Sequence, residues 1–167
     1  MKYPPPLWLI VLIGGITLLS EAMYSPALPE VADALGVSIP LVENTLTIYL
    51  LGIACGVLFF GPLSDRFGRK PCLLVGLSIY TLGCFACYGA STIEMLMFGR
   101  LIQAFGASVG SAIGQSIARD SYKGRELGKA YSVVGGALTI FPAIGPMLGG
   151  IITEEYSWNA NFLVLAI

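Results

Sequence analysis

Two ionisable residues, Glu21 and Arg100, lie inside otherwise apolar stretches of this 167-residue chain. Charged groups are costly in a membrane interior, so each is a candidate functional group. Glu21 is the only carboxylate well inside a predicted span, and the chain contains no histidine. A carboxylate in a half-dry cavity can exchange a proton for a cationic substrate near neutral pH, so Glu21 is the predicted proton carrier. The alternative is that Glu21 lies near enough to the outer end of its helix to be hydrated and merely tolerated.

Arg100 brings a permanent positive charge, because a guanidinium does not lose its proton in a protein. The guanidinium requires a hydrogen-bond acceptor. We expect its charge to tune a nearby carboxylate or to help gate the proton of that carboxylate. Gln103, one helical turn later, adds a second polar group and favours a face directed toward a cavity. A snorkelling arginine with its head group in water is the alternative. Glu43 is predicted to lie at the membrane interface.

A third group of chemically active residues occurs in the segment Gly61-Pro-Leu-Ser-Asp-Arg-Phe-Gly-Arg-Lys-Pro71, which holds four charges and two glycines in eleven residues. It separates two apolar stretches that are each long enough to cross a membrane. Charge between such stretches belongs in an aqueous loop.

Other chemistries find little support. Cys55, Cys72, Cys84 and Cys87 lie in or beside apolar runs, where free cysteine behaves as a small hydrophobe, and Cys84-x-x-Cys87 lacks a second ligand pair for a metal site. No metal is expected.

The chain offers no nucleophile with a base and no phosphate loop, which argues against an enzyme. The net charge of -1 and the scattered basic residues argue against nucleic-acid binding.

The elements that must position these residues are membrane-spanning helices. The chain is 56% hydrophobic and 11% charged, against about 45–50% apolar and about 25% charged in soluble domains. Spans of about 20 apolar residues suffice to cross a bilayer as helix. We predict an all-α integral membrane fold with spans near 7–27, 41–62, 72–91, 95–117 and 130–152, and a sixth that begins near Asn161 and is incomplete at Ile167. The chain is therefore expected to be part of a longer protein.

The distribution of lysine and arginine predicts the orientation of these spans. Basic residues are retained in cytoplasmic loops, so the N-terminus is predicted to be cytoplasmic in the inner membrane. The predicted loops 28–40, 92–94 and 153–160 contain no basic residue and carry Glu30, Asp33, Glu94, Glu154 and Glu155. The residues on the predicted cytoplasmic side are Lys2, Arg66, Arg69, Lys70, Arg119, Lys123, Arg125 and Lys129.

Glycine and proline mark the helices that approach closely or bend. The spacings Gly52-x-x-x-Gly56, Gly106-x-x-x-Gly110-x-x-x-Gly114 and Gly145-x-x-x-Gly149 predict close contact between helix backbones. Pro26 and Pro29 are predicted to end the first span. The fifth span contains Pro142, Gly145, Pro146, Gly149 and Gly150, so this helix is predicted to be bent or deformable. A static kink is the alternative to a functional hinge.

These motifs resemble the major facilitator superfamily, most closely its drug/proton antiporters with twelve helices of the bicyclomycin-chloramphenicol resistance type. The segment 61–71 resembles the family signature between helices 2 and 3, including Gly61, Gly68, Arg66 and Lys70. The resemblance implies a charge network that latches one conformation. Its predicted residues are Asp65, Arg69 and Asp120, together with Arg66 and Lys70 of the same loop. The resemblance covers the whole chain, 1–167, which corresponds to the N-terminal six-helix domain of the family. The C-terminal six-helix domain is expected to be absent from this sequence.

Three further segments carry the resemblance. Residues 96–110 resemble the helix 4 motif, which implies a role in proton coupling for Arg100. Residues 143–150 resemble the end of the antiporter motif in helix 5, although Phe141 stands where the fuller motif has glycine. Residues 21–29 resemble the helix 1 signature, with Glu21 where many members have Asp.

The resemblance implies alternating-access export of hydrophobic or cationic drugs in exchange for protons, with the proton gradient as energy source and no cofactor. The partners expected are a small-molecule substrate, protons, the lipid bilayer and the missing C-terminal domain, so the isolated chain is not expected to transport. Possible substrate-cavity residues are Tyr24, Tyr49, Gln103 and Phe141, and helix packing is the alternative role for each of the three aromatic residues. Proton-coupled movement of a specific metabolite is the first alternative, and a membrane scaffold or sensor is the second.

Overall fold

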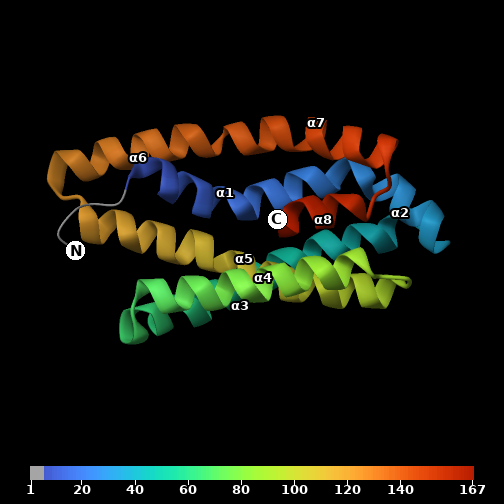
Figure 1. The fold of residues 1–167 in the computed structure, drawn as a ribbon, viewed down its shortest axis with the longest axis horizontal. Helices are drawn as coiled ribbons and strands as arrows, with labels where there is room; N and C mark the ends of the chain where they lie inside the picture. Colours follow the sequence, from blue (N-terminus) through green and yellow to red (C-terminus); the bar gives the residue numbers. More distant parts are fainter. Residues whose placement is uncertain (1–5) are drawn as a thin grey trace.

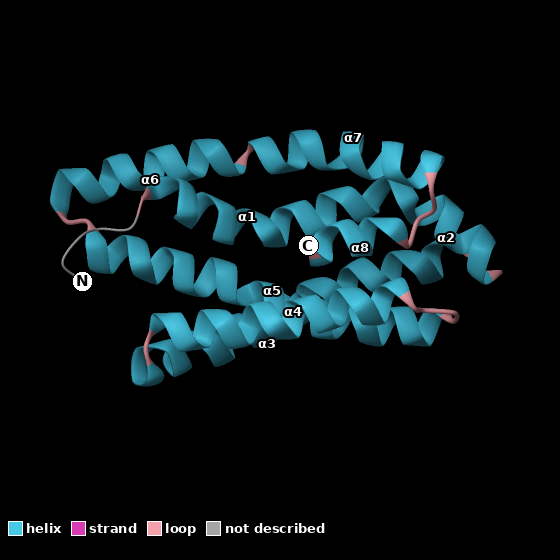
Figure 2. Cartoon of the chain, viewed as in Figure 1, coloured by secondary structure: helices cyan, strands magenta, loops and turns pink. Residues whose placement is uncertain are grey.

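The computed structural model describes residues 6–167, and every regular element within them is a helix (Figures 1 and 2). Five stretches are long and apolar enough to cross a membrane: 7–35, 39–67, 69–88, 93–121 and 124–155. The predicted all-α membrane fold is thus confirmed. The elements are α1 (Leu7–Tyr24), the 3₁₀ turn η1 (Ser25–Ala27), α2 (Leu28–Leu35), α3 (Ile39–Phe67), α4 (Arg69–Tyr88), α5 (Ile93–Ser121), α6 (Gly124–Leu138), α7 (Ile140–Glu155) and α8 (Ala160–Ala166).

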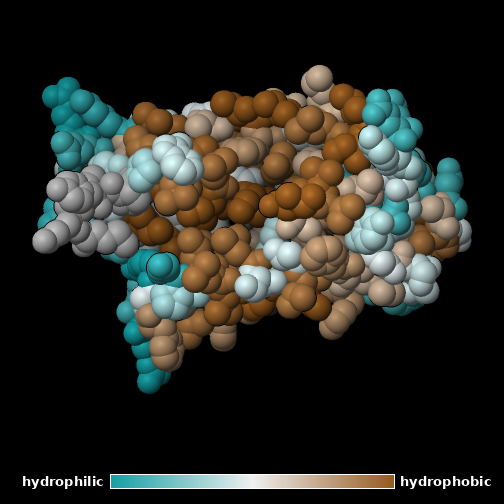
Figure 3. All heavy atoms as spheres, in the orientation of Figure 1, coloured by the Kyte–Doolittle hydropathy of each residue, from teal (hydrophilic) through white to brown (hydrophobic). Residues whose placement is uncertain are grey.

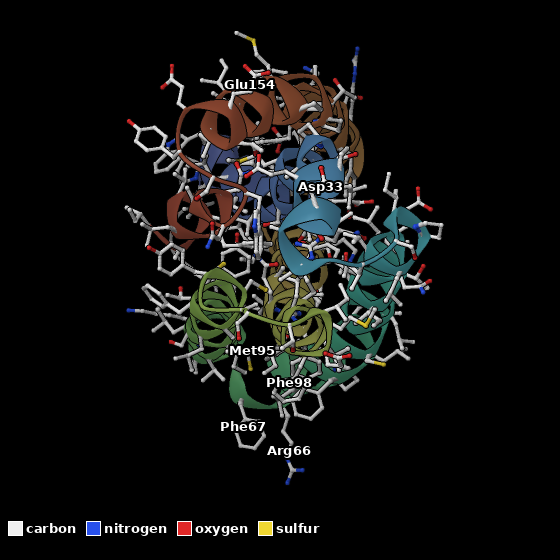
Figure 4. All side chains as sticks on the ribbon, turned by 90° about the vertical axis from the view of Figure 1, so that its right-hand side faces the viewer. Asp33, Arg66, Phe67, Met95, Phe98 and Glu154 are labelled. Carbon is white, nitrogen blue, oxygen red and sulfur yellow. The ribbon has the colours of Figure 1, made fainter. Side chains whose placement is uncertain are left out.

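Helix α5 is the centre of the bundle and packs against α1, α3 and α4, while α7 packs on α1 and α8 packs on α4 (Figure 1). The α3–α4 and α5–α6 turns lie at the same end, which we call the basic end. Its residues include Arg66, Arg69, Lys70, Arg119, Lys123, Arg125 and Lys129. Lys2, predicted for this side, lies outside the described residues. Asp33 and Glu154 mark the opposite end (Figure 4).

The surface of the bundle has the pattern of a membrane protein. An apolar band covers its middle, and hydrophilic residues gather at the two ends (Figure 3). Many large apolar side chains on this band are exposed, among them Leu58, Leu82 and Met147. Exposed apolar surface of this extent is expected where lipid is the solvent.

Small residues bring the helices of the bundle into contact, as their spacing predicts. A Cβ atom on Gly52 or Gly56 would lie 2.9 Å or 2.7 Å from a carbonyl oxygen of α5, and one on Gly106 would lie 2.7 Å from the carbonyl oxygen of Gly76 in α4. At Gly110 a Cβ would collide with the carbonyl oxygen of Ile13. Any side chain at these four positions would push the helices apart.

The first span differs from the prediction that Pro26 and Pro29 end it. The chain stays helical through η1 and α2 to Leu35, and it turns at Gly36, whose φ is +63°. Each proline occupies the first or second position of a new helical segment. The missing N–H of proline has no helical partner at such a position, so the two residues change the helix type without ending the span.

The fifth span is interrupted, as its prolines predict. Helix α6 ends at Leu138 and α7 begins at Ile140, with Thr139 between them (Figure 2). Pro142 provides the reason, because it has no N–H for the carbonyl of Leu138 and its ring would collide with that carbonyl in a regular helix. Pro146, in contrast, lies inside α7.

Candidate functional site

Glu21 lies on α1 beside a pocket of about 270 Å³ that opens between α1, α3 and α7. The side chain is half-buried, and within residues 6–167 it makes no hydrogen bond or ion pair. The other lining residues are Leu18, Ala22, Ser25, Leu46, Pro142 and Pro146. The pocket is mostly apolar with one unpaired carboxylate, an arrangement suited to exchanging a proton for a lipophilic cation.

The proline- and glycine-rich part of α7 packs directly on the Glu21 turn of α1. Gly145 faces Ala22 and Gly149 faces the carbonyl of Met23, and a Cβ at either glycine would collide with α1. Pro142 and Pro146 border the Glu21 pocket, whereas Gly150 faces open space. The predicted helix 5 motif and the predicted proton carrier therefore meet, although they are far apart in sequence.

Phe141 lies apart from the Glu21 pocket. It packs closely against Gly15 of α1 and lines a separate apolar pocket of about 420 Å³ between α1, α4, α7 and α8. A residue of this size at position 141 therefore fills space beside Gly15 that a glycine would leave open.

Arg100 is completely buried in the core between α1, α3 and α8. Its Cζ lies 4.5 Å from the ring centroid of Tyr24, 4.1 Å from that of Tyr49 and 5.8 Å from that of Phe162. The Nη1 group donates a hydrogen bond of 2.8 Å to Oε1 of Gln103, while Nε and Nη2 have no partner. No ion pair to Arg100 occurs within residues 6–167.

These contacts exclude the snorkelling alternative for Arg100, and they place in the core three residues considered for a substrate cavity. Arg100 is not a snorkelling arginine, because its head group stays in the core. Tyr24, Tyr49 and Gln103 are not cavity-lining residues in this structure, because each is 0% exposed and all three surround Arg100. A buried guanidinium requires polarisable neighbours, and the two rings and the amide provide them.

Sequence reasoning missed two members of the Arg100 site. Phe162 comes from α8, and Cys84 of α4 accepts a hydrogen bond of 3.1 Å from Nε2 of Gln103. Both lie in apolar runs, where nothing in the sequence distinguishes them from packing residues.

At the basic end, Arg69 joins α3, α4 and α5. Its Nη1 lies 2.7 Å from Oδ1 of Asp65 and donates to Oγ of Ser64 at 2.6 Å, and its Nη2 lies 3.1 Å from Oδ2 of Asp120. Both carboxylates are exposed. The structure thus brings together Asp65, Arg69 and Asp120, three of the five residues predicted for the charge network, and it adds Ser64.

Arg66 and Lys70 do not join this cluster. Both are exposed, and Arg66 lies over the ring of Phe67, 5.5 Å from its centroid, with both side chains projecting outward from the bundle (Figure 4). Gly68, at the α3–α4 turn, has φ +94°, a conformation that side chains rarely adopt. Gly61 faces open space.

The chain was compared with known proteins. The model of the Major Facilitator Superfamily matches residues 10–167. An uncharacterized transporter of Rickettsia felis is 40% identical over 162 residues, which cover 97% of this chain and 40% of that protein. The chloramphenicol resistance protein of Pseudomonas aeruginosa is 37% identical, with 95% and 39% covered. The riboflavin transporter RibZ of Clostridioides difficile is 30% identical, with 94% and 35% covered. The chain spans about two fifths of the length of such curated relatives.

Proposed function

The chain belongs to the major facilitator superfamily, and from this premise we propose that it forms the N-terminal half of a transporter that exports hydrophobic or cationic drugs in exchange for protons. Superfamily members of this kind work by alternating access around a site near the membrane midplane. The likeness to a chloramphenicol resistance protein supports a drug as the substrate.

The observation that carries the proposal is the unpaired Glu21 carboxylate in a mostly apolar pocket. A lipophilic cation placed there would gain apolar contact from the walls and attraction from the carboxylate. Protonation of Glu21 would remove that attraction. Proton and cation would therefore compete for one group, and competition of this kind couples their opposite movements.

The remaining features fit the same proposal. We place the basic end on the cytoplasmic side of the inner membrane, with the N-terminus inside, because basic residues are retained there. The Arg69 cluster ties three helices together at that end and would bias the equilibrium between two conformations. The packing of α7 on the Glu21 turn would transmit changes in the pocket to the Thr139 break. The energy source is the proton gradient, with no cofactor and no enzymatic step.

Proton-coupled movement of a specific metabolite is the second candidate. It is favoured by the likeness to a riboflavin transporter and by Phe141, which stands where the antiporter motif has glycine. Counterflow measurements on the complete protein separate the two, because a metabolite transporter accumulates one compound and ignores unrelated lipophilic cations. A scaffold or sensor on the same fold would move neither.

The test uses the complete reading frame in inside-out vesicles and follows proton release when tetraphenylphosphonium is added. We expect release in the wild type and none in Glu21→Gln. Glu43→Gln is the matched control, because Glu43 is an exposed carboxylate near the N-terminal end of α3. Equal release from wild type and Glu21→Gln would place the coupling carboxylate elsewhere. Absence of release from both would overturn drug/proton exchange.

A further inference from the structure

The aromatic rings around Arg100 form a built site for its guanidinium. Tyr24 from α1 and Tyr49 from α3 place their rings 4.5 Å and 4.1 Å from Cζ, and Phe162 adds a third ring at 5.8 Å. All three aromatic side chains are 0% exposed. Attraction between a cation and aromatic faces is strongest where water is excluded, as it is here.

The two tyrosine rings are themselves fixed by hydrogen bonds of their hydroxyl groups. The Tyr49 hydroxyl donates to the carbonyl oxygen of Thr17 at 3.0 Å, and the Tyr24 hydroxyl accepts from Oγ1 of Thr45 at 3.0 Å. Each bond crosses between α1 and α3. The rings are therefore held in orientation independently of Arg100, which makes the site preorganised.

The site holds the positive charge without cancelling it. Nε and Nη2 of Arg100 have no acceptor, and no carboxylate pairs with it within the described chain. A buried charge is normally paired, so a chain selected for stability alone would place a carboxylate or an apolar residue here. Two contacts bring this charge to the Glu21 turn of α1. The Tyr49 ring lies against Arg100 while its hydroxyl donates to Thr17, one helical turn before Glu21. The ring of Tyr24, three residues after Glu21, also lies against Arg100.

We propose that Tyr24 and Tyr49 are positioning residues, which hold Arg100 at a fixed place without neutralising it so that its positive charge acts on Glu21. They are not a stacking surface for the substrate. This inference rests on the proposed function, in which Glu21 carries the proton. It differs from that function in assigning a role to two residues that touch neither proton nor drug.

The first experiment measures tetraphenylphosphonium binding and proton release together on the purified complete protein. In Tyr49→Leu we expect the protons released per bound cation to fall at least about fivefold, with the cation Kd changed less than about threefold, because the ring face is lost but the apolar volume is kept. Tyr49→Phe keeps the ring face but loses the hydrogen bond to Thr17, so its loss of proton release should be smaller than that of Tyr49→Leu. Tyr80→Leu is the matched control, because Tyr80 is also buried and bonds to Ser20 but contacts no arginine.

Two outcomes of this experiment would overturn the inference. If Tyr49→Leu weakens cation binding while the protons released per bound cation stay constant, Tyr49 is a substrate-stacking residue. If Tyr80→Leu loses proton release as fully as Tyr49→Leu does, the effect is general damage to the core.

A second experiment does not depend on transport. Thermal unfolding of Arg100→Met, Tyr49→Leu and the double variant forms a double-mutant cycle. Both substitutions remove the same interaction between Arg100 and Tyr49. We therefore expect the change in Tm of the double variant to differ from the sum of the two single changes. Additive changes would overturn the positioning role. If wild type releases no protons but the cycle is non-additive, the proposed function fails while the arginine–tyrosine site stands.

Discussion

Arg69 and Arg100 show how one residue type is accommodated in water and in a core. Arg69 lies at the basic end, where its side chain is 19% exposed and contacts Asp65, Asp120 and Ser64. Arg100 is wholly buried among three aromatic rings, and among residues 6–167 it contacts one amide and no carboxylate. Exposed ion pairs are inexpensive to form and contribute little stability. A buried unpaired charge is expensive, so folding stability does not account for the presence of Arg100.

Among the tests of this comparison between Arg69 and Arg100, the substitution Arg100→Met is expected to have the largest effect. We expect proton release to fall by about tenfold or more, because the fixed positive charge proposed to act on Glu21 is gone. We also expect thermal stability to be unchanged or higher by about 1–4 kcal/mol, because apolar replacements of buried charges often stabilise. Proton release and thermal unfolding of the complete protein measure both effects. A large loss of stability would show that Arg100 is a structural residue.

A smaller effect is expected for Arg69→Ala. The substitution removes two exposed ion pairs and a hydrogen bond, so the loss of stability should be about 1 kcal/mol. Transport should slow several-fold, because a shift of this size changes the populations of two conformations, while protons per substrate stay constant. Initial rates and stoichiometry in vesicles distinguish the two quantities. A change in stoichiometry would contradict the assignment of Arg69 to the conformational equilibrium.

Salt should separate the two arginines further. Raising ionic strength from about 0.1 M to about 1 M shortens the screening length from about 10 Å to about 3 Å, which weakens exposed pairs much more than buried contacts. The difference in Tm between wild type and Arg69→Ala should therefore shrink at high salt. The difference between wild type and Arg100→Met should persist, and equal sensitivity of the two would show that water reaches Arg100.

The smallest effect is expected for Arg66→Ala and Lys70→Ala. Both side chains are exposed and neither joins the Arg69 cluster, so each change should alter stability by less than about 0.5 kcal/mol. Transport rates should stay within about twofold of wild type. These variants are also the controls for Arg69→Ala. A loss as large as that of Arg69→Ala would place them in the same network in another conformation.

The two sites differ in how far the sequence could predict them. Asp65 and Arg69 are four residues apart on one polar segment, so they stay close together although the turn at Gly68 separates α3 from α4. Asp120 is 51 residues away from Arg69, and only the resemblance to a known family connects it to the pair. At Arg100 the sequence indicated Gln103, and it left Tyr24 and Tyr49 open between substrate stacking and helix packing. It offered no reason to include Phe162 or Cys84.

The sequence by itself determined the class of the protein, its apolar stretches and the charged turn at the basic end. The free energy of transfer into lipid sums over a window of residues and does not depend on which helices are neighbours. Only the tertiary structure decided which polar groups meet. Helices surrounded by lipid are apolar on their outer and inner faces alike, so periodicity does not reveal the face that turns inward. Close approach at Gly52, Gly110 and Gly145 sets those faces, and this packing leaves Glu21 open to a pocket and Arg100 closed between two tyrosines.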